Sequence, residues 1–129
     1  MATVALTKDT FDETVQNNDT VIVDFWAEWC GPCRSFAPTF EAESEKHDDI
    51  VFAKVDTEDQ QELAMAFGIR SIPTLMVFKE QVILYSQPGA LPPNMLEDLI
   101  GQVKNVDMDD VRSQIAEQET AHESEPAAN

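Results

Sequence analysis

WCGPC, residues 29–33, contains the only two cysteines of this 129-residue chain, Cys30 and Cys33. A disulfide between residues three apart closes a very short loop, and the stabilisation that a disulfide gives grows with the length of that loop. At the start of a helix the two Cα atoms lie roughly 5 to 6 Å apart, within the range that a disulfide needs. The pair is therefore expected to open and close without a change of fold.

The composition fits a single globular domain whose core folds without disulfides, since 43% of the 129 residues are hydrophobic. The first 20 residues include five charged side chains and no apolar run of signal-peptide length. No stretch is long and apolar enough to suggest a membrane span. The expected location is therefore the cytoplasm, where a spaced cysteine pair is more often catalytic or metal-binding than structural.

Metal binding is the first alternative for the cysteine pair. Structural zinc takes four Cys or His ligands, and besides the two cysteines the chain has His47 and His122, which show no ligand spacing. Residue 34 is arginine, so the haem-attachment pattern CxxCH is absent as well. We therefore expect a redox pair, with no metal site and no bound cofactor.

Predicted strands and helices alternate around the motif. Strands are expected at residues 4–6, 20–26, 50–56, 73–79 and 82–87, from runs of β-branched and aromatic residues. Helices are expected after residue 10, over residues 34–47, between 57 and 68 and from about residue 92, from the spacing of apolar positions. The order is β-α-β-α-β-α-β-β-α, and the cysteines lie where the second strand passes into a helix. A CxxC motif in that setting is typical of a redox site.

Several stretches around this motif resemble the thioredoxin family. They are VDFWAEWCGPCR (residues 23–34), Pro38, AKVD (53–56), GIRSIPTLMVFK (68–79) and PGAL (88–91). The resemblance runs from about residue 4 to residue 104, and WCGPC with a downstream Ile-Pro-Thr is a highly specific combination. It implies an α/β thioredoxin fold, a central mixed β-sheet flanked by helices on both faces. It also implies a monomeric protein-disulfide reductase that acts on disulfide-containing proteins and is recharged by a flavoprotein thioredoxin reductase with electrons from NADPH.

The resemblance assigns different roles to the two cysteines, and the physics of the motif agrees. Cys30, expected to be exposed at the helix N-terminus, would be the nucleophile, because free N–H groups and the helix dipole there stabilise a thiolate. Cys33 lies one turn further in and would resolve the mixed disulfide. Gly31 permits a close approach of the partner, and Pro32 costs no hydrogen bond in the first helical turn and stiffens it.

Asp24 and Lys54 each interrupt an apolar strand. From the residues alone, Asp24 is either a strand-edge carboxylate that faces water or a buried one, which is costly to ionise without a partner. Its match to a buried aspartate of the family implies that it accepts the proton of Cys33. Lys54 either lies near enough to Asp24 to tune it or extends from the sheet into solvent.

The resemblance also implies a surface beside the cysteines that docks an extended substrate peptide. Its residues are Trp29, Ile72, Pro73, Gly89 and Ala90. A cis Ile72–Pro73 bond would leave the Ile72 backbone free to pair with the peptide. From the residues alone, a trans bond and a proline that merely opens a strand are the ordinary interpretation. Gly89 is equally well explained as a turn glycine.

Two departures from the family pattern bear on these expectations. Lys79-Glu80-Gln81 stands between the last two strands, where the family usually has a glycine that relieves a tight turn, so a wider turn is expected. Pro88 replaces the usual β-branched residue near the substrate surface. That replacement affects partner preference and not the thiol chemistry.

The net charge bears on the possible partners, and the C-terminal segment bears on the domain bounds. The formal net charge of −17 and the lack of a basic patch argue against nucleic acids and anionic membranes as partners. A thioredoxin domain is expected over residues 1–105, followed by a short helical extension at 106–117, in which Met108, Val111 and Ile115 approximate one face. Residues 118–129 lack large apolar side chains, so an acidic, disordered tail is expected there.

Two alternatives to a reductase remain from the sequence. One is a thioredoxin-fold binding or scaffold subunit without turnover, and the other is a disulfide oxidant or isomerase. A purely structural role needs none of Cys30, Cys33, Asp24 and Pro73, all of which are present. Oxidants and isomerases usually carry another dipeptide between the cysteines, and a signal peptide.

Overall fold

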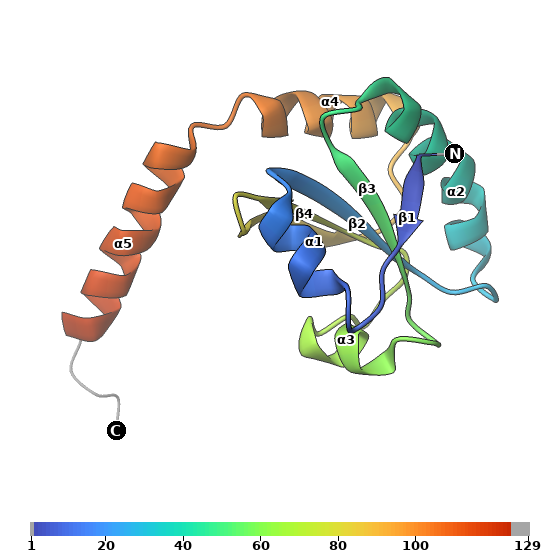
Figure 1. Cartoon of the computed structure of the whole chain (residues 1–129), viewed down its shortest axis with the longest axis horizontal. Helices are drawn as coiled ribbons and strands as arrows, with labels where there is room; N and C mark the ends of the chain where they lie inside the picture. The colour runs from blue at the N-terminus through green and yellow to red at the C-terminus, as the bar shows by residue number, and fades with distance from the viewer. Residues whose placement is uncertain (1, 125–129) are drawn as a thin grey trace.

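Five strands form one sheet, and helices cover both of its faces in the computed structural model, which describes residues 2–124 (Figure 1). The strands are β1 (Thr3–Ala5), β2 (Thr20–Trp26), β3 (Val51–Asp56), β4 (Thr74–Lys79) and β5 (Val82–Pro88). The helices are α1 (Phe11–Asn17), α2 (Gly31–Lys46), α3 (Gln61–Ala66), α4 (Pro93–Lys104) and α5 (Met108–Ser124). The predicted α/β architecture and the order of its elements up to α4 are confirmed. None of the helices within residues 2–124 combines the length and the apolar character needed to cross a bilayer.

β2 lies at the centre of the sheet, whose strand order is β1-β3-β2-β4-β5. β1 and β2 run parallel to β3, whereas β4 is antiparallel to β2 and β5 is antiparallel to β4. The carboxyl ends of β2 and β3 therefore meet at one edge of the sheet, and β4 begins at that edge. The motif that follows β2 is thus brought next to the segments that follow β3 and precede β4.

Alternation along β2 divides the apolar side chains between two cores. Val21, Val23 and Phe25 pack in the core on the side of α1 and α3. Ile22 packs on the opposite side against buried residues of α2 and α4, namely Phe36, Phe40, Leu96 and Ile100. Asp24 has the same parity as Ile22, so its side chain lies on the α2 side of the sheet.

α2 begins at Gly31, three residues before the predicted start, and Cys30 is its N-cap. Pro32 falls in the first helical turn, where an N–H group would have no intrahelical partner. The helix then continues through Pro38 to Lys46. The cysteines therefore lie at the start of a long helix, beside N–H groups that the helix itself leaves free.

The turn between β4 and β5 is tight, so the expectation of a wider turn is wrong. Lys79 pairs directly with Val82, which leaves only Glu80 and Gln81 in the turn. Both have positive φ, 50° and 69°, as the central residues of a type I′ hairpin do, and this turn type matches the twist of the strands. The Glu80 N–H also donates to the Asp19 carbonyl at 2.7 Å, which helps to hold a left-handed conformation that these side chains disfavour.

α5 begins at Met108, within the helical extension predicted at 106–117, and extends to Ser124, seven residues beyond the predicted end. The Asp107 carboxylate caps it by accepting two backbone N–H groups of the first turn, at 3.0 and 3.2 Å. Met108 is buried, and Figure 1 shows the rest of α5 leading away from the sheet. Residues 118–124 are helical where a disordered tail was expected, and glutamate, glutamine and alanine in this stretch have favourable helix propensities. Residues 125–129 of that tail lie outside the described residues.

Candidate active site

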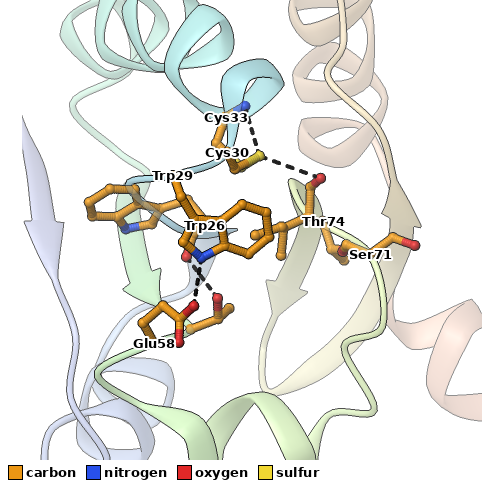
Figure 2. Close-up of a disulfide and its surroundings, with 9 residues drawn as sticks. Trp26, Trp29, Cys30, Cys33, Glu58, Ser71 and Thr74 are labelled. Carbon is orange, nitrogen blue, oxygen red and sulfur yellow. Dashed lines mark hydrogen bonds between the residues drawn. A yellow bond between two sulfur atoms is a disulfide. The ribbon is translucent and has the colours of Figure 1, made fainter.

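The two cysteines form a disulfide at the N-terminus of α2 (Figure 2). Their Cα atoms are 5.3 Å apart, as their position at the start of a helix predicts. Cys30 Sγ accepts the Cys33 N–H at 3.2 Å, which makes this sulfur the cap of the helix. After reduction, a negative charge on Cys30 Sγ is stabilised by this N–H and by the dipole of a 16-residue helix.

Cys30 is more enclosed than expected, because only 4% of its surface is exposed, against 2% for Cys33. The expectation of an exposed Cys30 is therefore wrong for the disulfide form. Ala27, Trp26 and Ile72 pack around the two cysteines, and the Ile72 carbonyl oxygen lies 3.7 Å from Cys30 Sγ. The topology causes this burial, since the segment that precedes β4 passes beside the end of β2. In this form Ile72 and its neighbours leave little of the Cys30 side chain exposed.

Asp24 is buried completely on the α2 side of β2, with an exposed fraction of 0%. It lies opposite Lys54 of β3 and Leu75 of β4. Neither carboxylate oxygen has a hydrogen-bond partner among the residues that the structure describes. Burial raises the pKa of Asp24 to about 7, and the positive charge of Lys54 opposes that shift. Asp24 therefore gains or loses a proton near neutral pH, and of its two sequence interpretations the buried one is correct.

Lys54 is half-buried in register with Asp24 and does not simply extend into solvent. Its Nζ lies 4.7 Å from the centre of the Trp26 ring, in a cation–π arrangement. Trp26 itself packs against the cysteine cluster. The ring therefore holds a positive charge near Asp24, close enough to lower the pKa of that carboxyl.

The residues expected to dock a substrate differ in exposure. Trp29 is 67% exposed, and Gly89 and Ala90 are exposed as well, whereas Ile72 is half-buried and Pro73 is buried. The Ile72–Pro73 peptide bond is cis, as the resemblance implies. The Gly89 N–H donates to the Pro73 carbonyl at 2.8 Å with a φ of 111° at Gly89, so the turn-glycine interpretation holds too. Pro73 therefore offers little surface to a partner, and Trp29 offers the most.

Comparison with known proteins decides the family. The thioredoxin family model matches residues 2–102. This chain belongs to the thioredoxin family. It is 58% identical over 118 residues to a putative thioredoxin 2 of Streptomyces coelicolor, a match that covers 92% of this chain and 88% of the relative. It is 41% identical over 104 residues to a thioredoxin of Porphyra purpurea, covering 79% of this chain and 97% of that one.

Solved thioredoxin structures agree with this assignment. A thioredoxin of Plasmodium falciparum superposes with a TM-score of 0.72 at 36% identity, over 78% of this chain and 97% of the other. A mutant thioredoxin from Halobacterium salinarum superposes with a TM-score of 0.74 at 32% identity, over 81% and 92% of the two chains. The chain is thus a thiol-disulfide oxidoreductase that reduces protein disulfides with its Cys30–Cys33 pair. The fold class and the activity predicted from the sequence are confirmed.

An acidic rim, formed by Glu28, Asp56 and Glu58, is the part of this thioredoxin site that sequence analysis missed. These carboxylates line a hollow beside the Trp29 ring. The indole Nε1 of Trp29 donates to Glu58 Oε1 at 2.6 Å (Figure 2). The feature that could have indicated this rim is the topology. The ends of the parallel strands β2 and β3 meet at one edge of the sheet, which brings the residues after β3 next to the motif after β2. A partner that contacts Trp29 therefore meets negative charge.

Proposed function

We propose that Cys30 is the nucleophile of this reductase and Cys33 the resolving thiol. The observation that carries the proposal is that the sulfur of Cys30 accepts a helix N–H at the start of α2. That contact favours the Cys30 thiolate, because the N–H group and the helix dipole both stabilise negative charge. Cys33 lies within the first turn, which suits attack on the neighbouring Cys30 sulfur and not on a partner.

The reaction proceeds by two thiol–disulfide exchanges. The Cys30 thiolate attacks one sulfur of the substrate disulfide, which forms a mixed disulfide and releases the other substrate sulfur as a thiolate. The Cys33 thiolate then attacks Cys30 Sγ, which closes the Cys30–Cys33 disulfide and releases the second substrate sulfur. Two electrons pass from the dithiol to the substrate, and two protons lost by the cysteines are balanced by two that the released thiolates take up.

Asp24 takes the proton of Cys33 in the proposed mechanism. Its carboxylate has no hydrogen-bond partner among the described residues, and its pKa of about 7 lets it accept a proton near neutral pH and release it later. Ala27, three residues after Asp24, packs against both cysteines, so the carboxylate and the thiols belong to adjoining parts of one buried region. Lys54 lowers the pKa of Asp24 and so tunes the proton transfer.

An extended segment of the substrate protein docks, in this proposal, on the residues beside the disulfide: Trp29, Ile72, Pro73, Gly89 and Ala90. In support, Trp29 presents a large exposed ring next to Cys30. The Ile72 carbonyl oxygen lies 3.7 Å from the Cys30 sulfur, so the backbone there is close enough to align a peptide with the reacting atom.

Electrons for the next cycle come from NADPH through a flavoprotein thioredoxin reductase, which reduces the Cys30–Cys33 disulfide. The chain needs no cofactor of its own, because both exchanges use sulfur atoms alone. Residues 1–105 form the catalytic unit and act as a monomer in the cytoplasm, and the segment from residue 106 contributes no catalytic group.

Insulin reduction driven by NADPH and a thioredoxin reductase tests the activity, and trapping tests the roles. Cys33→Ser is expected to accumulate a mixed disulfide between the substrate and Cys30, because no thiol is left to resolve it. Cys30→Ser is the matched control and is expected to trap nothing. Equal trapping by the two variants would contradict the assigned roles, and a rate no higher than background would contradict the reductase itself.

A further inference from the structure

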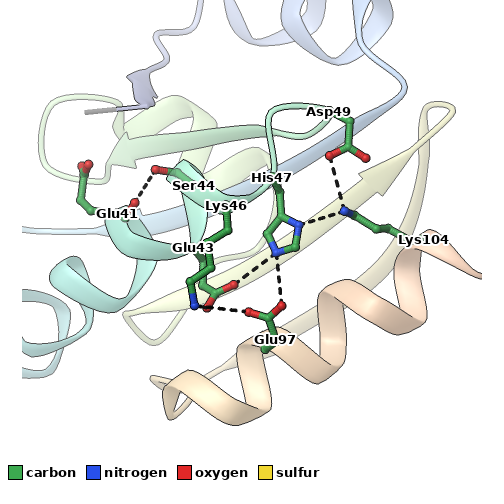
Figure 3. Close-up of polar contacts among 8 residues, drawn as sticks. All are labelled: Glu41, Glu43, Ser44, Lys46, His47, Asp49, Glu97 and Lys104. Atoms are coloured by element: carbon green, nitrogen blue, oxygen red, sulfur yellow. Dashed lines mark hydrogen bonds and ion pairs between the residues drawn. The ribbon is translucent and has the colours of Figure 1, made fainter.

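Six charged or polar side chains gather where the C-terminal end of α2 meets α4, in a region that the thiol chemistry does not use (Figure 3). They are Glu43, Lys46, His47, Asp49, Glu97 and Lys104. Glu43 follows Cys30 by 13 residues, so the cluster lies roughly 20 Å along the helix from the disulfide. Any ligand of this cluster therefore occupies a site separate from the redox centre.

Glu43 and His47 are buried with polar atoms that lack a hydrogen bond. The Glu43 side chain is 3% exposed and the His47 side chain 11%. Glu43 Oε2 and His47 Nε2 lie 3.3 Å apart, which is an ion pair only if the ring is protonated, and neither atom makes a hydrogen bond to a described residue. Buried polar atoms in this state are uncommon in native proteins, and each requires an explanation. Figure 3 shows the His47 ring turned toward the carboxylates of Glu43 and Glu97.

We propose that Glu43, His47 and Glu97 bind a zinc ion. His47 Nε2 lies 3.3 Å from Glu43 Oε2 and 3.5 Å from Glu97 Oε1, and the three ligand atoms all lie within 4.8 Å of one another. Ligands about 2.0–2.2 Å from a tetrahedral zinc are roughly 3.3–3.6 Å apart, so one ion between these atoms fits the observed spacing with a small movement of Glu97. One imidazole and two carboxylates leave the fourth position to water.

Local structure holds two of these ligands in place. Glu43 and His47 are four residues apart at the end of α2, so they share one face of the helix. The His47 ring stacks on Phe52, with 6.4 Å between the ring centres and 19° between the planes. Glu97, on α4, has a side chain that is 48% exposed and completes the set from the solvent side. The two ligands at the end of α2 are thus held in place, and an ion can enter the site from solvent on the side of Glu97.

Lys46 contacts both carboxylates and offsets part of their negative charge. Its Nζ lies 3.3 Å from Glu43 Oε1 and 3.7 Å from Glu97 Oε2. The atoms assigned to the ion are the opposite oxygens, Glu43 Oε2 and Glu97 Oε1. Lys46 and a zinc ion therefore contact different oxygens, and the lysine does not block the site.

Lys104 contacts the other ring nitrogen of His47, Nδ1, and this contact disfavours the binding of an ion at Nε2. Its Nζ lies 2.9 Å from His47 Nδ1, and since an ammonium group only donates, the neutral imidazole carries its proton on Nε2. Zinc at Nε2 moves that proton to Nδ1 and turns Lys104 away from the ring. Asp49, whose carboxylate lies 3.5 Å from the same Nζ, is the partner to which Lys104 turns.

Calorimetric titration with zinc chloride tests the site. The full chain is used in its disulfide form, since reduced Cys30 and Cys33 would themselves bind zinc. His122→Gln serves as the background, because it removes the only other histidine. One saturable site is expected. Glu97→Gln is expected to weaken the affinity by about tenfold or more. Asp98→Asn makes the same change at an exposed neighbour on α4 and is expected to leave the affinity unchanged.

A second pair of variants tests the part played by Lys104. Lys104→Gln is expected to tighten zinc binding by roughly threefold or more, because glutamine can accept the Nδ1–H of a metal-bound imidazole. Lys8→Gln removes the same charge from an exposed position that pairs with Glu62, outside the cluster, and is expected to have no effect. In the ¹⁵N spectrum of His47, zinc is expected to shift the Nε2 resonance and to place the proton on Nδ1.

Three results would overturn the zinc site. They are the lack of saturable binding by the disulfide form, binding that survives Glu97→Gln unchanged, and a ¹⁵N spectrum of His47 that zinc does not alter. Glu97 is exposed, so its substitution leaves the core intact, and circular dichroism of each variant confirms the fold before titration.

Discussion

Asp24 lies within β2, and Lys79 is the last residue of the neighbouring strand β4; both are charged and buried, with exposed fractions of 0% and 9%. Lys79 Nζ donates to the carbonyl of Val103 at 2.8 Å and to that of Lys104 at 3.4 Å. These carbonyls end α4, where positive charge is favourable. Asp24 has no such hydrogen bonds to any described residue.

The difference separates a charge that supports the fold from one that serves the chemistry. A buried charge that is hydrogen-bonded stabilises its surroundings. A buried charge without hydrogen bonds costs free energy, so the group is readily converted to its neutral form. Lys79 joins the sheet to the end of α4 through a hydrogen bond, whereas the Asp24 carboxylate makes no hydrogen bond to a described residue. Substitutions of the two residues should therefore change stability in opposite directions.

Asp24→Asn is expected to stabilise the protein at alkaline pH, the largest effect that we predict. The pKa of Asp24 is raised from 3.8 to about 7 in the folded protein. Folding therefore favours the protonated carboxyl, and this contribution is complete below pH 3.8 and is lost as the pH rises through about 7. The loss amounts to about 4 kcal/mol above pH 7. Urea unfolding should show the variant to be more stable than the wild type near pH 8 and similar to it near pH 4.

An exposed carboxylate provides the control for this measurement. Asp12→Asn on α1 removes one negative charge from the surface. If it stabilises the protein near pH 8 as much as Asp24→Asn does, the gain comes from the lowered net charge and not from burial.

The same Asp24→Asn variant is expected to reduce insulin more slowly near neutral pH, by about tenfold. Cys33 loses its nearby proton acceptor, so the second exchange slows and the mixed disulfide on Cys30 persists for longer. Rapid-quench trapping of that adduct separates this step from the first attack. An unchanged rate of insulin reduction would contradict the role of Asp24, even if its effect on stability is found.

Lys79→Met is expected to destabilise the protein by about 1–2 kcal/mol, because buried carbonyls at the end of α4 lose their donor. Insulin reduction should stay at the wild-type rate at a temperature where the variant is folded. Chemical denaturation and the insulin assay measure the two quantities. A variant of normal stability and reduced activity would assign Lys79 to the chemistry and remove the contrast with Asp24.

Local sequence patterns were enough to predict β2 and the helix that follows the cysteines. Family resemblance was enough for the overall fold and for the cis bond before Pro73. The burial of Asp24 was one of two open interpretations, because a single polar residue in an apolar run also fits the edge of a sheet. The strand order, which places β2 at the centre, agrees with the buried interpretation that the family resemblance implied.

Features that depend on distant segments were not predictable in this way. The family resemblance placed Ile72 beside the cysteines, but not the near-complete burial of Cys30 under a residue 42 positions further along the chain. His47 and Glu97 meet only because α2 and α4 pack on the same face of the sheet, so no spacing in the sequence indicates their pairing. The tight turn at Glu80 and Gln81 is imposed by the paired strands and not by residues that prefer positive φ.

Gln81→Gly tests that turn, which directly follows Lys79. Glycine adopts the φ of 69° at this position without the clash of a Cβ atom, so a gain of about 0.5–1 kcal/mol is expected after the entropy of glycine in the unfolded chain is counted. Glu80→Gly relieves the same kind of strain but removes the ion pair with Arg112, and it should gain less. Thermal unfolding measures both variants. A loss of stability in Gln81→Gly would show that the turn is not strained.

The smallest effect is expected from shortening α5 after Gln118. Met108 packs on the domain, but none of residues 109–119 is buried. A chain that ends at Gln118 should therefore unfold within about 0.5 kcal/mol of the full chain and reduce insulin at the same rate. Met108→Ala in the full chain is the counterpart and should lower the stability by about 2 kcal/mol, because it empties a buried site. If the shortened chain instead loses as much stability as Met108→Ala, or loses activity, then the residues after Gln118 contact the domain or the active site, and the boundary of the catalytic unit at residue 105 is wrong.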